Sequence, residues 1–151
     1  MNFQDQLNSK LKSAMREKNK VALESLRAIK SAILLLQTQS GAKETPDDNE
    51  ITKLLQKLVK QRKESASIFR EQGRVDLAEP EEAQIEIISQ FLPEQLSAEE
   101  VEKVIDEVIQ SVGATTMKDM GKVMGMANKQ LAGKADGKLI AGIVKKRLGE
   151  L

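Results

Sequence analysis

Apolar residues recur at helical spacing along nearly the whole chain of 151 residues, and no convincing run alternates apolar with polar residues. Spacing of this kind gathers the apolar side chains on one face of a helix, and that face must pack against another element. The sequence therefore predicts an all-α fold, with a multihelical N-terminal part made of helix hairpins and a small three-helix C-terminal module. Pro93–Ser97 is the natural boundary, so the expected domains are residues 1–92 and 93–151.

Residues typical of helix ends indicate where the N-terminal helices begin. Asn19 separates two apolar stripes and is suited to cap a helix. Thr45 is the expected N-cap of a long helix, after a polar loop that contains Gly41. Asp76–Glu79 has the spacing of a capping box, which would place Pro80 in the first turn of the next helix. Four helices are thus expected before residue 93.

The C-terminal module shows three helical segments. Ser97–Glu100 is a capping box that opens the first segment, and Gly113 is its expected stop. The second helix is predicted from about Met117 to Ala132, and the third from about Gly137 to Leu148. The buried stripe of the second helix is expected to comprise Met117, Met120, Val123, Met124, Ala127 and Leu131.

The composition limits the available chemistry. The chain has no histidine and no cysteine, which removes the commonest general base, thiolate chemistry and the usual zinc ligands. Tyr and Trp are also absent, so a platform that stacks on single-stranded bases is not expected. An enzyme would have to rely on carboxylates, lysine, arginine and hydroxyls. The densest acidic cluster, formed by Glu99, Glu100 and Asp106, is expected on an exposed helix face.

The hydropathy pattern points away from membranes. The N-terminal residues lack the apolar core of a signal peptide. The longest uninterrupted apolar run, Ala32–Leu36, is far too short to span a bilayer. We therefore expect a cytoplasmic protein with no membrane partner, no metal and no other cofactor.

Charge is balanced in total but segregated along the chain. The formal net charge is +1, yet residues 53–74 carry net +5 and residues 76–86 carry net −5. We expect these two segments to form an antiparallel hairpin whose opposite charges face each other. The C-terminal module repeats the contrast, with net −5 over residues 93–112 and net +5 over residues 113–151.

The stretch GKVMGMANKQLAGKADGK, residues 121–138, carries much of this second basic charge. Its glycine–lysine pairs suggest a phosphate-binding loop, but the P-loop pattern fails. Seven residues separate Gly125 from Gly133 instead of four, Ala135 stands where Ser or Thr is needed, and no strand precedes the stretch. The GxGxxG pattern fails as well, because the chain has no Gly-x-Gly triplet.

On a helix, the residues of this stretch separate by role. Gly121 and Gly125 share one side, and the expected reason is close approach of another helix or of a ligand or RNA backbone. Gly133 and Asp136 are expected to end one helix and cap the next, with Gly137 completing the turn. The lysines would form a strip that contacts a phosphate backbone, and Arg147 adds charge to this strip. The lysines are Lys118, Lys122, Lys129, Lys134, Lys138, Lys145 and Lys146.

Several motifs together resemble the YqeY-like family. Asp119–Gly125 followed by Gly133–Lys138 looks like its signature, and Lys60–Ser65, Gly73–Leu77 and Phe91–Ser97 match its pattern upstream. The C-terminal motifs are also similar to the tail domain of GatB, a subunit of the amidotransferase that acts on mischarged tRNA. The resemblance covers almost the whole chain and implies an all-helical protein.

The resemblance implies a binding function without supplying an active site. The first hypothesis is an accessory protein that binds tRNA or assists a tRNA-modifying or aminoacylation enzyme. The second is a protein-interaction module that docks a partner through the helix containing Gly125 and Met126. The third rests on family similarity alone: a carbon–nitrogen ligase with glutamine as amide donor.

Overall fold

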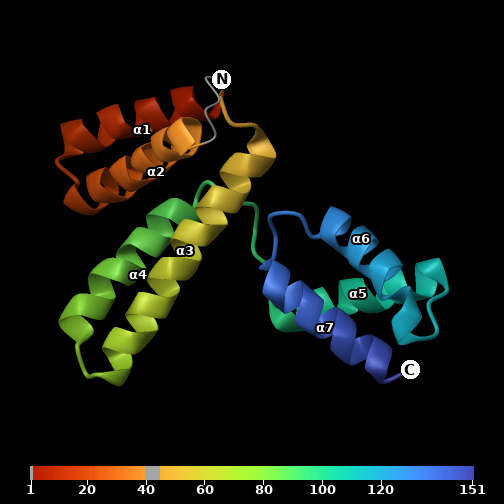
Figure 1. Cartoon of the computed structure of the whole chain (residues 1–151). Helices are drawn as coiled ribbons and strands as arrows, with labels where there is room; N and C mark the ends of the chain where they lie inside the picture. The colour runs from red at the N-terminus through yellow and green to blue at the C-terminus, as the bar shows by residue number, and fades with distance from the viewer. Residues whose placement is uncertain (1, 40–44) are drawn as a thin grey trace. The chain divides into compact units, whose positions relative to one another are not determined.

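The computed structural model describes residues 2–39 and 45–151, and within these ranges the chain is helical and has no strand (Figure 1). The all-α prediction is confirmed. The loop predicted around Gly41 lies outside the described residues. The chain is divided into two compact units, with the boundary between Leu92 and Pro93. The helices are α1 (Phe3–Glu17), α2 (Lys20–Gln39), α3 (Asp48–Glu71), α4 (Val75–Ser89), α5 (Ala98–Val112), α6 (Met120–Gln130) and α7 (Gly137–Gly149), with a 3-10 turn, η1 (Met117–Asp119), before α6.

The first unit, Met1–Leu92, consists of two helix hairpins. α1 packs against α2 and α3 packs against α4, while α2 also contacts both α3 and α4 (Figure 1). Asn19 joins the first hairpin, where its Oδ1 accepts a 3.1 Å hydrogen bond from the Ala22 N–H, so the predicted cap is confirmed. The core is formed by Leu7, Leu11, Ala14, Ala22, Leu26, Ile29, Ile33, Ile51, Leu55, Val59 and Ile88.

The predicted cap at Thr45 is wrong, because Asp47 caps α3. The Asp47 Oδ1 accepts a 2.8 Å hydrogen bond from the Glu50 N–H, and the helix starts at Asp48. A carboxylate at this position also interacts favourably with the positive end of the helix dipole, which a threonine hydroxyl does less well. Local charge therefore moves the start of the helix beyond the expected residue.

The predicted capping box at Asp76–Glu79 is also wrong. Asp76 lies inside α4 and binds Arg74, with an Nη2–Oδ2 distance of 3.0 Å. A charge-assisted pair of this geometry competes with capping for the carboxylate. Because α4 begins at Val75, Pro80 lies within the helix beyond the first turn, and the helix ends at Ser89. Phe91 follows the end of this helix.

The predicted hairpin of opposite charges is confirmed between α3 and α4. The Arg70 Nη2 donates a 2.8 Å hydrogen bond to the Glu82 Oε2. This hydrogen bond, assisted by the guanidinium charge, holds the pKa of Glu82 below its usual range. Pairing does not extend along the whole of α3, since Lys53 and Lys57 are exposed and form no ion pair within the described ranges.

The second unit, Pro93–Leu151, is a bundle in which α5, α6 and α7 pack against one another. Ser97 caps α5, as its hydroxyl accepts a 3.2 Å hydrogen bond from the Glu100 N–H, and Gly113 ends the helix with a φ of +67°. Both positions were predicted. The core is formed by Val101, Ile105, Val108, Ile109, Val123, Ala127, Leu131, Ala135, Ile140, Ile143, Val144 and Leu148.

The helix predicted from Met117 to Ala132 is shorter than expected. Its first residues form η1, and the α-helical part covers Met120–Gln130. Thr116 and Asp119 form a capping box at this turn, and 3-10 turns are frequent at the ends of α-helices. Met117 therefore leaves the predicted buried stripe and is 43% exposed.

Candidate nucleic-acid interface

α6 presents glycines and lysines on its solvent-exposed face. Gly121 and Gly125 lie one turn apart, and Lys122 and Lys129 lie three residues before and four residues after Gly125. All four residues are exposed, whereas Val123 is buried on the opposite side. Residues three and four positions apart are neighbours on a helix surface. The face therefore places two cations beside helix backbone that the glycines leave uncovered.

One of the expected reasons for Gly121 and Gly125 is wrong, namely close approach of another helix of this chain. A Cβ atom added at either glycine would meet no further atom within 4 Å in the described part of the chain. Both glycines face away from the core, which α6 contacts through Val123 and Ala127. Close approach of a ligand or an RNA backbone stays a prediction for these positions.

α7 repeats this arrangement at Gly142, a residue that sequence reasoning missed. Lys138 lies four residues before Gly142, and Lys145 and Lys146 lie three and four residues after it. The three lysines are exposed, and a Cβ atom at Gly142 would also meet nothing within 4 Å among the described residues. The signal was present in the sequence, as a glycine between lysines at helical spacing.

The turn between α6 and α7 has the predicted glycine, but the predicted side-chain cap is not formed. Gly133 adopts a φ of +75°, which suits a glycine that follows the end of a helix. Asp136 occupies the N-cap position of α7, whose first residue is Gly137, but its side chain makes no capping hydrogen bond to that helix. The Gly133 carbonyl accepts a 2.6 Å hydrogen bond from the Gln95 Nε2, so the segment before α5 holds this turn. Lys134 is exposed at the same turn.

Lys118 lies in η1, whose geometry depends on Asp119. The Asp119 Oδ2 accepts hydrogen bonds of 2.9 Å and 3.3 Å from the N–H groups of Thr115 and Thr116. These two donors, with a further contribution from the charge of Lys122, hold the pKa of Asp119 below its ordinary value of 3.8. Asp119 therefore has a structural role at the entrance to α6.

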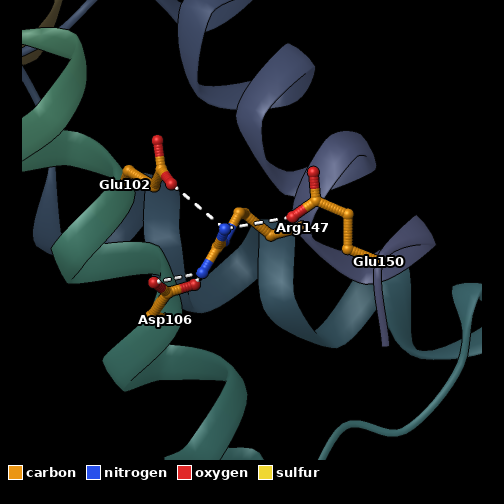
Figure 2. Close-up of polar contacts among 4 residues, drawn as sticks. All are labelled: Glu102, Asp106, Arg147 and Glu150. Atoms are coloured by element: carbon orange, nitrogen blue, oxygen red, sulfur yellow. Dashed lines mark hydrogen bonds and ion pairs between the residues drawn. The ribbon is translucent and has the colours of Figure 1, made fainter.

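Arg147 does not join the basic strip, contrary to expectation, because it connects α7 to α5 (Figure 2). Its Nε and Nη2 donate hydrogen bonds of 2.8 Å each to the two carboxylate oxygens of Asp106. Its Nη1 lies 3.1 Å from the Glu102 Oε1 and 3.0 Å from the Glu150 Oε2. The hydrogen bond to Asp106 raises the pKa of Arg147 above its usual value.

Two carboxylates of the predicted acidic cluster in the second unit serve the fold. Asp106, a member of the predicted acidic cluster, is held by Arg147. Glu100 accepts a 3.1 Å hydrogen bond from the Ser97 hydroxyl at the start of α5. In residues 2–39 and 45–151, no group of three acidic residues could hold a metal ion. The same ranges contain no helix with the length and apolar character needed to cross a membrane.

The seven lysines predicted as a strip are thus distributed over η1, α6, the following turn and α7, and each is exposed or partly exposed. None of their ammonium groups forms an ion pair within the described residues, in contrast to Arg147. These features define a class of protein: an all-helical protein of two units whose second unit displays unpaired lysines beside uncovered glycines.

The chain belongs to the family of Yqey-like proteins, whose model matches residues 4–148. It is 36% identical over 132 residues to the altered inheritance of mitochondria protein 41, mitochondrial, of Pyrenophora tritici-repentis; the match covers 85% of this chain and 71% of that protein. It is also 33% identical over 121 residues to the protein of that name from Clavispora lusitaniae, covering 80% of this chain and 69% of the relative.

A shorter match links the chain to an amidotransferase. It is 47% identical over 60 residues to a glutamyl-tRNA(Gln) amidotransferase component from Thermococcus gammatolerans. This match covers 37% of the chain but 10% of the archaeal protein, so it concerns a small part of that protein. The family relationship predicted from the motifs is confirmed. The expected cytoplasmic location stays a prediction, since the relatives from both fungi are named as mitochondrial.

Proposed function

We propose that this chain is an accessory protein that contacts tRNA through the lysines of its second unit and has no active site of its own. The observation that carries the proposal is the repeated surface of α6 and α7, in which exposed lysines flank an uncovered glycine. Lysines that form no ion pair within the described chain are available to phosphates. Glycines that no part of the described chain approaches leave room for a nucleic-acid backbone near the helix.

Two further observations support the proposal. The amidotransferase component that shares a stretch of 60 residues with this chain is named for its action on a glutamyl-tRNA. The sequence lacks Tyr and Trp, which favours recognition of a folded RNA by shape and charge over stacking on single-stranded bases. Transfer RNA provides such a backbone.

Binding of tRNA should be measured with the full chain at several salt concentrations. Four to six lysine–phosphate contacts would lower the affinity by roughly two to three decades between about 50 and 200 mM salt. Absence of binding at the lower salt concentration would contradict the proposal. Binding that does not change with salt would contradict it too, since it would not depend on phosphates.

Charge-reversal variants locate the contact. Lys122→Glu with Lys129→Glu tests α6, and Lys145→Glu with Lys146→Glu tests α7. Each pair should weaken binding. It should also reduce the slope of log affinity against log salt by about two, because two phosphate contacts are lost. Lys53→Glu with Lys57→Glu changes the same charge in the first unit and is the matched control, with binding expected to stay unchanged.

A second candidate function has its own observation. Met126 lies on α6 next to Gly125 and is 37% exposed, which also suits docking of a partner helix. A protein partner captured by the full chain should then survive nuclease treatment. Its binding should be lost in Met126→Ser and kept in Lys122→Glu with Lys129→Glu, which is the opposite of the pattern expected for tRNA.

A further inference from the structure

A groove in the first unit, separate from the proposed tRNA contact, runs between α2 and α3. Its volume is about 440 Å³, and its apolar lining includes Ala32, Leu35 and Leu36 from α2 and Leu54 and Leu58 from α3. Leu35 is 56% exposed, while Leu54 and Leu58 pack against the core from its edge. The volume falls within the range of roughly 300–1,000 Å³ that is typical of binding clefts.

The walls of the groove follow helical spacing. On α3 the lining residues run from Glu50 to Gln61, a length of about 16 Å at 1.5 Å per residue. On α2 they run from Ala32 to Gln39, a length of about 10 Å. The groove therefore has the length of two to three helical turns, which matches the apolar side of a short amphipathic helix.

The edge of the groove formed by α3 is basic. Lys53 and Lys57 lie one turn apart among the lining residues, and both are exposed. Neither forms an ion pair within the described ranges, so their charges are available to a partner. Glu50 is the acidic residue of the lining and lies at one end of the α3 wall. An occupant with carboxylates along one flank would complement this edge.

We infer that the groove between α2 and α3 binds an acidic amphipathic helix of a partner protein. Apolar side chains of that helix at positions i, i+3 and i+7 would enter between Leu35, Leu54 and Leu58. Carboxylates on the adjacent flank would face Lys53 and Lys57.

A second copy of this chain does not supply such a helix from its described residues. α5 is acidic and amphipathic, but its apolar side chains, including Val101 and Ile105, are buried in its own unit. α4 is the other helix with an acidic segment, and it is packed against α3 and α2. The occupant is therefore expected to come from another protein.

A designed peptide tests the inference with the full chain. The peptide has about four helical turns, leucines at i, i+3 and i+7, glutamates on one flank and a terminal tryptophan. Because the chain contains no Trp and no Tyr, the fluorescence of the peptide reports binding without background. The controls are a peptide whose leucines are scattered around the helix and a peptide in which lysines replace the glutamates.

Two variants on the same helix provide the matched comparison. Leu35→Asp puts a carboxylate inside the groove and should weaken peptide binding about tenfold or more. Leu34→Asp makes the same change at the next residue, which is 62% exposed and lines a different hollow with Leu7 and Ile33. Its affinity for the peptide should stay within about twofold of the original. Helix content measured by circular dichroism should be unchanged in both variants.

The basic edge has a separate test. Lys53→Glu with Lys57→Glu should weaken binding of the acidic peptide at least about tenfold and strengthen binding of the basic peptide. The inference would be overturned by equal binding of the acidic and scattered peptides, by equal loss in Leu34→Asp and Leu35→Asp, or by no saturable signal up to about 1 mM peptide.

Two additional measurements separate other sources of binding. The first measurement adds vesicles of anionic lipid to each leucine variant. If the vesicles bind the chain and displace the peptide equally in both variants, the surface binds membranes and the inference is overturned. Lys145→Glu with Lys146→Glu should leave peptide binding intact and weaken tRNA binding. Failure of the tRNA proposal and failure of the groove proposal are therefore distinguishable.

Discussion

Gly125 is an unfavourable residue for the middle of an exposed helix, because it has more conformational freedom to lose than alanine. Nothing within the described chain requires it: its backbone is helical, and the space beside it is open. Gly113 differs, since its φ of +67° is a conformation that other residues adopt at a cost. The two glycines should therefore respond to substitution in opposite directions.

We predict that Gly125→Ala increases the free energy of unfolding by about 0.5–1 kcal/mol and weakens tRNA binding. The added methyl group would hold the RNA backbone away from α6 without removing a charge. The dependence of affinity on salt should therefore keep its slope, unlike that of the lysine variants. Chemical denaturation and binding titrations measure the two effects.

Gly113→Ala is the control for this prediction. It should lower stability by about 1 kcal/mol because alanine is strained at positive φ. A stability gain in Gly125→Ala with unchanged tRNA affinity would contradict a close backbone approach at this glycine.

Single residues also show what the sequence leaves undetermined. The helical positions of Lys122, Lys138 and Gly142 follow from periodicity. The role of Arg147 does not, because its partner Asp106 lies 41 residues away and contacts it only after α5 and α7 pack. Periodicity likewise places Gly121 and Gly125 on one face, but tertiary packing decides that no helix of the described chain covers them.

At the scale of elements, helix ends were predictable where one local device acts alone. Asn19, Ser97 and Gly113 each cap or stop a helix as their residue types indicate. The prediction failed at Asp76, because pairing with Arg74 competes with capping. It also failed at Met117, where a 3-10 turn changes which face a side chain occupies. Spacing rules do not weigh such competing local interactions.

The packing of α5 against α7 provides a prediction at this scale. Arg147→Met should lower the thermal midpoint of the chain, because Asp106, Glu102 and Glu150 would be left close together without their cation. Arg147→Lys should lower it less, since it keeps the charge but not the two parallel hydrogen bonds. Thermal unfolding followed by circular dichroism measures both.

Lys146→Met is the neighbouring control, as Lys146 is exposed and forms no ion pair in the described structure. Its thermal midpoint should match that of the unchanged chain. If Lys146→Met and Arg147→Met had the same effect, the loss would reflect general charge on α7 and not the connection to α5.

At the scale of the whole molecule, both units contain carboxylates whose charged form the fold stabilises. Arg74 lowers the pKa of Asp76, Arg70 lowers that of Glu82, and backbone N–H groups lower that of Asp119. A lowered pKa in the folded state means that the unfolded chain binds more protons as pH falls. Their contribution is therefore complete at neutral pH and is lost in acid.

We predict that stability begins to fall near pH 4.5, the ordinary value for Glu, and continues to fall below pH 3.8, the ordinary value for Asp. Urea denaturation at constant ionic strength between neutral pH and about pH 3 measures the effect. Glu82→Gln should make the fall shallower, because it removes one of the three groups. Equal stability across this range would contradict the role given to these carboxylates.

The lysines of the second unit differ from Arg147 in one more respect. Since Lys129, Lys138, Lys145 and Lys146 form no ion pair within the described chain, neutralising them removes no contact on which the bundle depends. Acylation of these amines would therefore reduce the positive charge of α6 and α7 while α5 and α7 remain joined through the guanidinium of Arg147, which acylation of amines does not affect. Covalent chemistry on lysine would thus change the charge that α6 and α7 present while the contact between α5 and α7 is kept.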